Sequence, residues 1–408
     1  MKSLSVAIVA DNASTAFGGE SLIPYQYFCL LRKRGIDTWL CVHERCAKEL
    51  LELLPDAKGR MVFLEDSRFE LYLYQLENVE WLKYLSKPLS FVRQLSFNWR
   101  QRTQVKKLVK EQEITLLHQP IPVSPKQPSF LFNMGVPVMI GPMNGGMEIP
   151  RGMHDFQGPL ARFAVRCGRR IAALLNFFIP GKKKAALLLA ANERTYLALP
   201  SHEGRVEIMS ENGVDADLPP STPHEGPVAY IFVGRLIELK GVHYLIEAFQ
   251  KICKQFPCRL HIVGDGPERS KLEDLAKHTP NIIFHGQLPW KNCLKEIQES
   301  DVMIFPSMMD CGGAAVLEGM AYGKPVIATD WGGPPDYIDS QTGILISPLN
   351  DQQYIHDLSA AMEKLGNDRA LREKMGQRGV TKVLHDYTWE AKIEKILNFY
   401  QQLVGIHK

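Results

Sequence analysis

Short apolar segments alternate with amphipathic stretches at the start of the chain. The apolar segments are LSVAIVA (4–10), TWLCV (38–42) and MVFLE (61–65), and helical patterns occupy residues 20–34 and 44–54 between them. Strands that alternate with helices in this way form parallel sheets whose faces the helices cover. The pattern therefore predicts a βα series from the N-terminus onward.

The same alternation returns after a long helical and basic section. It has a helix from about residue 159 and the apolar segments ITLLHQP, PVMIGP, LLLAAN and RVEIMS. Residues 214–227 (VDADLPPSTPHEGP) then contain four prolines and no hydrophobic period, which is typical of a linker. A second βα series follows, with strands predicted at 228–234, 259–265, 281–286, 301–306 and 324–329.

These two series predict an α/β fold with two Rossmann-like, doubly wound parallel-sheet domains. We expect an N-terminal domain in residues 1–213, a linker in 214–227 and a C-terminal domain in 228–387. The last helical stretch, within 388–408, is expected to pack back on the first domain.

Composition supports a folded cytoplasmic protein. The 408 residues are 45% hydrophobic and 23% charged, enough for two buried cores rather than disorder. The most apolar zone, residues 171–192, is interrupted by Pro180, Gly181 and three lysines, so no segment is expected to span a membrane. The N-terminal segment is too short for a signal peptide, and the eight cysteines form no C-x-x-C pair. We expect a reducing, cytoplasmic setting.

Positive charge is concentrated in the first half of the chain. Residues 1–220 carry 28 Lys and Arg against 22 Asp and Glu, although the net charge of the whole chain is only +3. Two basic clusters are Arg93, Arg100, Arg102, Lys106, Lys107 and Lys110, and Arg162, Arg166, Arg169, Arg170, Lys182, Lys183 and Lys184. Each cluster can be explained as the solvated face of a helix, or as a surface that makes peripheral contact with the anionic inner face of the cell membrane. No recognised motif supports nucleic-acid binding.

Candidate ligand contacts follow the predicted strands, where doubly wound sheets bind their ligands. GRLIELKG places Arg235 and Lys240 in one loop before a helix, an arrangement that suits a diphosphate. The alternative is a solvated loop with two surface cations. In VGDGPE, Gly264 and Asp265 end the next strand, and glycine there allows close approach of a nucleotide; a turn without a ligand explains the same residues.

The segment 305–338 carries the densest set of candidates. Asp310 precedes a predicted helix and Glu318 lies within it, so that one suits sugar hydroxyls and the other a ribose. The amides of Gly312, Gly313 and Ala314 would point at a phosphate. Alternatively, Asp310 is a helix cap and Glu318 a buried partner of backbone groups.

Together these residues resemble the donor site of retaining glycosyltransferases of family 4, in group 1. The resemblance rests on Arg235, Lys240, the acid-x7-acid pair Asp310 and Glu318, the G-x-P-V-I-A that follows, and the Gly332-Gly333 pair. It implies a GT-B fold, with two Rossmann-like domains facing across a cleft, and a nucleoside-diphosphate sugar as donor, without metal or other cofactor. It also implies that Asp310, Arg235 and Lys240 act at the transferred sugar and the diphosphate.

One position departs from the family pattern. Asp310 stands where the family usually has Glu, and the sequence Asp-Cys-Gly-Gly that begins there indicates a bacterial-type Asp-x-Gly-Gly variant. Because Asp is one methylene shorter than Glu, this departure bears first on which donor sugar the site selects.

The first domain offers fewer candidates. The resemblance places Gly18 and Gly19 against the donor or acceptor, and His118, at the end of a strand, near the donor sugar, which it would orient. Asn144, Gly145 and Gly146 follow the next strand and would line the acceptor side. A tight turn, a structural histidine and an ordinary glycine-rich loop are the corresponding alternatives.

The function implied is transfer of a hexose, with retention, to a hydroxyl of a glycan or lipid-linked acceptor in cell-surface polysaccharide or glycolipid synthesis. A nucleotide-sugar epimerase of the same architecture is one alternative, and it would convert the donor without an acceptor. A non-catalytic subunit that binds a nucleotide sugar is another, favoured only by Asp310 in place of Glu.

Overall fold

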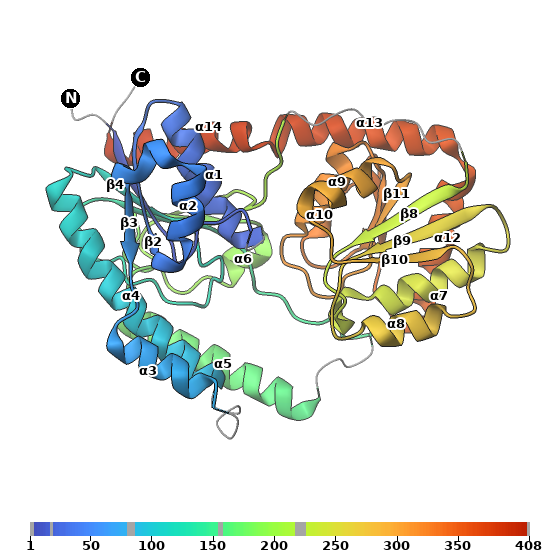
Figure 1. Ribbon diagram of the computed structural model, residues 1–408, viewed down its shortest axis with the longest axis horizontal. Helices are drawn as coiled ribbons and strands as arrows, with labels where there is room; N and C mark the ends of the chain where they lie inside the picture. The colour runs from blue at the N-terminus through green and yellow to red at the C-terminus, as the bar shows by residue number, and fades with distance from the viewer. Residues whose placement is uncertain (1–3, 17–18, 80–85, 154–157, 217–225, 406–408) are drawn as a thin grey trace. The chain divides into compact units, whose positions relative to one another are not determined.

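A computed structural model describes residues 4–16, 19–79, 86–153, 158–216 and 226–405; Figure 1 shows its ribbon and labels many of its elements. The chain divides into two compact units. The first unit contains Met1–Gly146, Phe163–Glu211 and Ile393–Lys408, and the second contains Met147–Arg162 and Asn212–Lys392. Each unit has its own parallel sheet, so the prediction of two Rossmann-like α/β domains is confirmed.

The sheet of the first unit has seven parallel strands in the order β3-β2-β1-β4-β5-β6-β7. All seven coincide with apolar segments of the sequence. They are β1 Ser5–Val9, β2 Asp37–His43, β3 Met61–Leu64, β4 Leu116–Gln119, β5 Val138–Met143, β6 Leu187–Ala190 and β7 Arg205–Ile208.

Helices connect and cover these strands. They are α1 Gly19–Lys33, α2 Ala47–Leu53, α3 Arg68–Glu77, α4 Ser86–Glu111, α5 Pro159–Phe178, α6 Glu193–Leu197 and α14 Trp389–Val404, with the short 3-10 helices η1 Glu44–Cys46 and η2 Pro55–Arg60. Helices α3 and α4 pack side by side (Figure 1). Val105 and Leu108 of α4 are buried in one core cluster with Ala7 and Val9 of β1, which fixes α4 on that face of the sheet.

The sheet of the second unit has six parallel strands in the order β10-β9-β8-β11-β12-β13. They are β8 Val228–Val233, β9 Cys258–Val263, β10 Ile282–Gly286, β11 Val302–Phe305, β12 Val326–Thr329 and β13 Gly343–Ile346. The sequence predicted the first five and missed β13. This strand is four residues long and lies at the edge of the sheet, so its apolar run is too short to stand out.

Helices cover both faces of this second sheet. They are α7 Val242–Ile252, α8 Arg269–Ala276, α9 Trp290–Gln298, α10 Ala314–Ala321, α11 Pro334–Tyr337, α12 Asp351–Asn367 and α13 Arg369–Asp386, with the 3-10 helix η4 Glu238–Lys240. Consecutive residues of β8 enter different core clusters, Tyr230 and Phe232 on one side and Ile231 on the other. Strands buried on both faces read as continuous apolar runs, as VAYIFV does.

The boundary between the units differs from the predicted one. Residues 147–162 cluster with the second unit, although the sequence placed them in the first. Three contacts hold this segment there. Met153 joins the core of the second unit. Gly152 packs so closely on the backbone of Leu349 that an added Cβ would lie 1.7 Å from the Leu349 carbonyl oxygen. The Trp331 indole donates a hydrogen bond to the Glu148 carbonyl at 2.7 Å.

The chain enters and leaves the second unit through adjacent segments. Val214 and Thr388 form an isolated parallel bridge, and the Val214 amide donates to the Tyr387 carbonyl at 3.0 Å. The middle of the expected linker, residues 217–225, lies outside the described residues. From Ile393 the last helix belongs to the first unit, where Tyr400 is fully buried.

Candidate functional site

The loops after β8 and β11 meet at the point where the strand order of the second sheet reverses. Strands β9 and β10 lie on one side of β8, whereas β11, β12 and β13 extend from its other side. Open α/β sheets bind ligands at the carboxyl ends of the strands that flank such a switch point. Arg235 and Lys240 follow β8, and the segment 310–314 follows β11, so these predicted residues converge in the structure.

Backbone contacts join the two loops. The Met308 amide donates to the Leu239 carbonyl at 2.9 Å. Gly241 follows Lys240 with a φ of +66°, and a Cβ there would meet the Pro306 carbonyl oxygen at 2.2 Å. Only glycine combines that left-handed backbone with so close an approach. Gly241 thereby fixes where η4 ends and where Lys240 lies.

Lys240 and Asp310 form an ion pair between the loops. Both side chains are about one-fifth exposed, at 20% and 18%. The Lys240 ammonium group also lies 5.4 Å from the centroid of the Phe305 ring. The sequence brought these two residues to one site but did not predict that their charged groups would touch. The contact leaves one cation and one carboxylate preorganised beside a solvent-accessible surface.

Arg235 is the second cation of the pair, and its side chain is exposed. Within the part of the chain that the structure describes, its guanidinium group has no ion-pair or hydrogen-bond partner. An exposed, unpaired guanidinium beside a paired lysine suits bidentate contact with a phosphate.

Asp310 is also tied to the start of α10. One of its carboxylate oxygens accepts a hydrogen bond from the Gly313 amide at 3.2 Å, and its carbonyl accepts from the Gly333 amide at 2.9 Å. The Gly313 amide, predicted to face a phosphate, therefore donates to Asp310 instead. The corresponding roles of Gly312 and Ala314 stay predictions.

Glu318 lies on α10, where burial raises the pKa of its carboxyl group. The Trp290 side chain donates a hydrogen bond to this carboxyl group and opposes the shift. The residue as a whole is only partly buried, so the carboxyl group lies in a desolvated spot next to accessible surface. Trp290 was not among the sequence candidates, because an aromatic residue 28 positions away gives no local signal.

Gly264 and Asp265 have partners within the fold. Gly264 has a φ of +136°, and a Cβ there would meet the Gly234 carbonyl oxygen at 1.9 Å, so packing against the loop after β8 requires glycine. The Gly266 amide and Arg269 hold the pKa of Asp265 below its usual range. The Asp265 carboxylate accepts from them at 2.7 and 3.0 Å. Contact of these residues with a nucleotide stays a prediction.

His118 is the third of the four residues of β4, at the switch point of the first sheet between β1 and β4. It is fully buried. Its Nδ1 atom lies 2.6 Å from the Tyr400 hydroxyl and its Nε2 atom 2.6 Å from the Gly141 carbonyl oxygen. Its ring stacks on Tyr27. Burial lowers the pKa of His118 to about 4. Both ring nitrogens are engaged within this unit, which favours the alternative of a structural histidine. Orientation of a sugar by His118 stays a prediction.

Asn144 belongs to a buried polar network rather than an open surface. It is 3% exposed, and its amide donates to Glu211 at 2.6 Å. Its carbonyl oxygen accepts from Arg194 at 3.2 Å and lies 3.3 Å from the Thr195 hydroxyl. A contact of Asn144 with an acceptor stays a prediction.

The predicted site glycines of the first unit differ in whether the fold itself requires glycine at their positions. A Cβ at Gly145 would meet the Pro125 side chain at 2.5 Å, and Gly146 has a φ of +75°. Both positions are thus explained by packing or backbone conformation. A Cβ at Gly19 would meet no described atom within 4 Å, so the described fold does not itself require glycine there. Gly18 lies outside the described residues.

The first basic cluster is largely paired within its own unit. Arg93 contacts Glu77 at 2.8 Å, Arg100 contacts Glu70, and Arg102 donates to the Phe132 carbonyl. In the second cluster, Lys182 is only 2% exposed and donates to the Ser124 carbonyl at 2.8 Å, and burial lowers its pKa to about 7. Lys182 is therefore a structural residue, contrary to its grouping with surface cations.

Helix α5 carries Arg166, Arg169 and Arg170 of that cluster on a surface with exposed apolar groups. Ile171, Leu174 and Phe178 recur at helical spacing and are 55%, 58% and 69% exposed, and Phe177 is 78% exposed. Arg166 and Arg170 are exposed on the flank of this stripe. Among the described residues, no helix is both long and apolar enough to cross a membrane.

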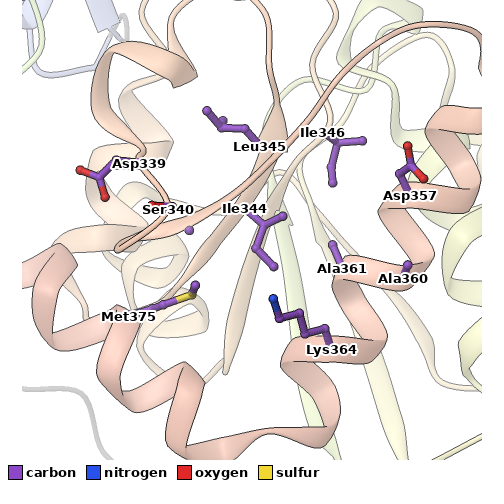
Figure 2. A pocket seen from close by; sticks show the side chains of 11 residues that line it. Asp339, Ser340, Ile344, Leu345, Ile346, Asp357, Ala360, Ala361, Lys364 and Met375 are labelled. Atoms are coloured by element: carbon purple, nitrogen blue, oxygen red, sulfur yellow. The ribbon is translucent and has the colours of Figure 1, made fainter.

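Figure 2 shows a pocket elsewhere in the second unit, between β13, α12 and α13. Asp357, Ala361 and Lys364 of α12 line it together with Ile344 of β13. None of the predicted site residues is in its wall, and its Asp339 is already paired with Lys382 at 2.6 Å. The pocket is separate from the charged loops after β8 and β11.

Residues 215–382 match the family model of group 1 glycosyl transferases. Curated relatives include an uncharacterized glycosyltransferase of Methanocaldococcus jannaschii, 30% identical over 42% of this chain and 44% of its own. A sulfoquinovosyl transferase of Arabidopsis thaliana is 32% identical over 41% and 32% of the two chains. A GDP-mannose-dependent mannosyltransferase of Corynebacterium glutamicum that acts on a phosphatidylinositol monomannoside is 30% identical over 41% and 45%. The match spans less than half the length of each relative.

Solved structures resemble the chain over nearly its whole length. A glycosyltransferase of Rickettsia africae superposes with a TM-score of 0.66 at 15% identity, covering 98% of this chain and 99% of that one. The Anabaena protein HepE, solved in complex with UDP, also gives 0.66 at 16% identity, covering 98% and 100%. At such identities the likeness shows the fold. The GT-B architecture implied by the sequence motifs is therefore confirmed.

Proposed function

We propose that the chain is a retaining glycosyltransferase that moves a hexose from a nucleoside-diphosphate sugar to a hydroxyl group of a glycan or lipid-linked acceptor. The observation that carries the proposal is the convergence of Arg235, Lys240 and Asp310 at the switch point of the second sheet. Residues 215–382, which contain all three, match the group 1 glycosyl transferases, and HepE, of the same fold, was solved with UDP.

In this proposal the donor diphosphate lies against the two cations. Arg235 takes phosphate oxygens directly, and Lys240 exchanges part of its contact with Asp310 for contact with the diphosphate. As the bond from the anomeric carbon to the diphosphate breaks, the cations stabilise the growing negative charge. The acceptor oxygen bonds to the anomeric carbon, and its proton passes to the departing phosphate. No step requires a metal ion.

Asp310 and Glu318 bind the other parts of the donor. The Asp310 carboxylate accepts hydrogen bonds from hydroxyls of the transferred sugar, while its hydrogen bond from the Gly313 amide holds its position. Glu318 accepts from the ribose, where its desolvated setting strengthens the contact. Asp310, shorter than the usual Glu, sets the sugar chosen.

An assay with a panel of nucleoside-diphosphate sugars, EDTA and glycan or lipid acceptors tests the activity. We expect turnover with one donor, and NMR of the product should show the same anomeric configuration as the donor. Lys251→Ala, which removes an exposed cation from α7, should leave the rate unchanged. A donor converted without transfer would indicate an epimerase, and an absolute requirement for metal would contradict the mechanism.

We further propose that α5 places the protein on an anionic membrane that carries the acceptor. Its exposed stripe of Ile171, Leu174 and Phe178 is flanked by arginines, and no acidic residue occurs from 156 to 192. Apolar side chains enter the headgroup boundary while cations attract anionic lipids.

Sedimentation with vesicles tests this contact. The protein should sediment with vesicles of phosphatidylglycerol and phosphatidylcholine, and weakly with phosphatidylcholine alone. Phe177→Ala with Phe178→Ala should reduce the bound fraction several-fold, whereas Leu197→Ala, which removes another exposed side chain of this unit, should not. Equal binding by both variants would contradict the proposal.

A further inference from the structure

Two histidines and a glutamate converge on one face of the second sheet. His261 lies on β9, His285 on the edge strand β10 and Glu296 on α9, which packs nearby. The two imidazole rings stack with centroids 5.1 Å apart. Sequence spacing gives no hint of this group, because the members lie on three separate elements and match no metal-binding motif.

The three ligand atoms have the separations that one metal ion would impose. His261 Nδ1 lies 3.0 Å from His285 Nε2 and 3.5 Å from a Glu296 carboxylate oxygen, which lies 3.7 Å from His285 Nε2. A point equidistant from three such atoms is about 2.0 Å from each, which matches zinc–nitrogen and zinc–oxygen bond lengths. Two imidazoles and one carboxylate form a donor set that zinc and similar ions prefer.

The surroundings leave this group of side chains accessible to solvent. The side chains of His261, His285 and Glu296 are 16%, 19% and 23% exposed, so water can complete the coordination. Arg259 is the neighbouring cation on the same strand, β9.

We propose that His261, His285 and Glu296 bind one divalent transition-metal ion, of which zinc is the best match. The ion would have three protein ligands and one water molecule. It would join the edge strand β10 to β9 and to α9, and so stabilise an edge beyond which the described residues form no further strand. This site is separate from Arg235, Lys240 and Asp310, and it is independent of the proposed transfer reaction.

Calorimetric titration of the EDTA-stripped, buffer-exchanged full chain with Zn²⁺ tests this site, with Co²⁺ absorption as a second probe of coordination. We expect one Zn²⁺ ion to bind per chain, with an affinity that depends on all three ligand residues. His261→Ala and His285→Ala should each weaken this binding at least about tenfold. Glu296→Gln, which keeps the side-chain shape, should also weaken it. His278→Ala, at an exposed histidine of the same unit, should bind as the wild type does.

Two results would overturn the proposal. One is the absence of stoichiometric Zn²⁺ binding by the wild type. The other is unchanged affinity in Glu296→Gln and in the two histidine variants, which would place the ion elsewhere. Nucleotide binding is measured in EDTA, so the two proposals are tested separately. A chain that binds no Zn²⁺ can still be a transferase, and a chain without transferase activity can still bind Zn²⁺ at this site.

Discussion

The two sheets place chemically different groups at equivalent points of their topology. In the first sheet the switch point holds His118, which is fully buried, neutral at physiological pH and engaged by Tyr400 and the Gly141 carbonyl. In the second it holds the part-exposed ion pair of Lys240 and Asp310 with the exposed Arg235. His118 and its partners complete a buried core, whereas Lys240, Asp310 and Arg235 leave charged groups available to a ligand.

This difference teaches that position at a strand end does not itself make a residue functional. A polar group there can satisfy other groups of the fold or remain free for a substrate, and its burial and partners decide between the two. We therefore expect changes in the second unit to reduce donor binding and turnover, and changes at His118 to reduce stability.

The largest effect on turnover is expected from Lys240→Ala. Loss of this cation removes stabilisation of the leaving diphosphate, and single preorganised groups of this kind contribute about 100-fold to 1000-fold in rate. We expect kcat/KM to fall by about that factor, with a small change in the unfolding midpoint because the side chain is part-exposed. A loss under about threefold would contradict its assignment to the leaving group.

His118→Ala should destabilise the chain while sparing the donor site. The change leaves the Tyr400 hydroxyl and the Gly141 carbonyl without their partner and opens a cavity beside Tyr27. Such losses cost about 2–5 kcal/mol in free energy of unfolding. Urea denaturation measures this loss. If stability is unchanged and kcat alone collapses, then His118 acts on the substrate.

The pH dependence of stability isolates the same histidine. Its pKa is about 4 in the folded chain and near 6.5 when unfolded, so the unfolded state binds the proton first as pH falls. Stability should therefore be full above the unfolded pKa and fall between about pH 6.5 and 4. From pH 7 to 5 the loss attributable to His118 is about 2 kcal/mol. The slope should flatten in His118→Gln, and an equal slope in both proteins would exclude this cause.

Arg235→Ala should have the smallest of these effects. The guanidinium group is exposed and solvated, so its contact with a phosphate stabilises less than a desolvated one does. We expect nucleotide affinity to weaken about tenfold, or about 1.4 kcal/mol. Arg235→Lys should recover part of the loss, since charge is kept and the bidentate geometry is not. Competition binding with the nucleoside diphosphate measures both variants.

Local patterns in the sequence predicted most of the fold. Apolar runs such as VAYIFV identify strands buried on both faces, whereas the four-residue edge strand β13 was missed. The resemblance to the family pattern placed Lys240 and Asp310 at one donor site, and the structure brings the two loops together. The sequence could not show that His118 is engaged by Tyr400, since that hydroxyl lies 282 residues further along the chain. The partner of a buried group is a property of packing.

The most direct test is calorimetric titration of UDP, GDP and ADP, in EDTA, into the wild type, Lys240→Ala and His118→Ala. The account predicts that one nucleotide binds the wild type and that Lys240→Ala weakens it at least about tenfold. It also predicts that His118→Ala, held at a temperature where it is folded, binds with wild-type affinity. If no nucleotide binds the wild type, or if His118→Ala loses affinity while Lys240→Ala keeps it, the assignment of the donor site to the second unit is wrong.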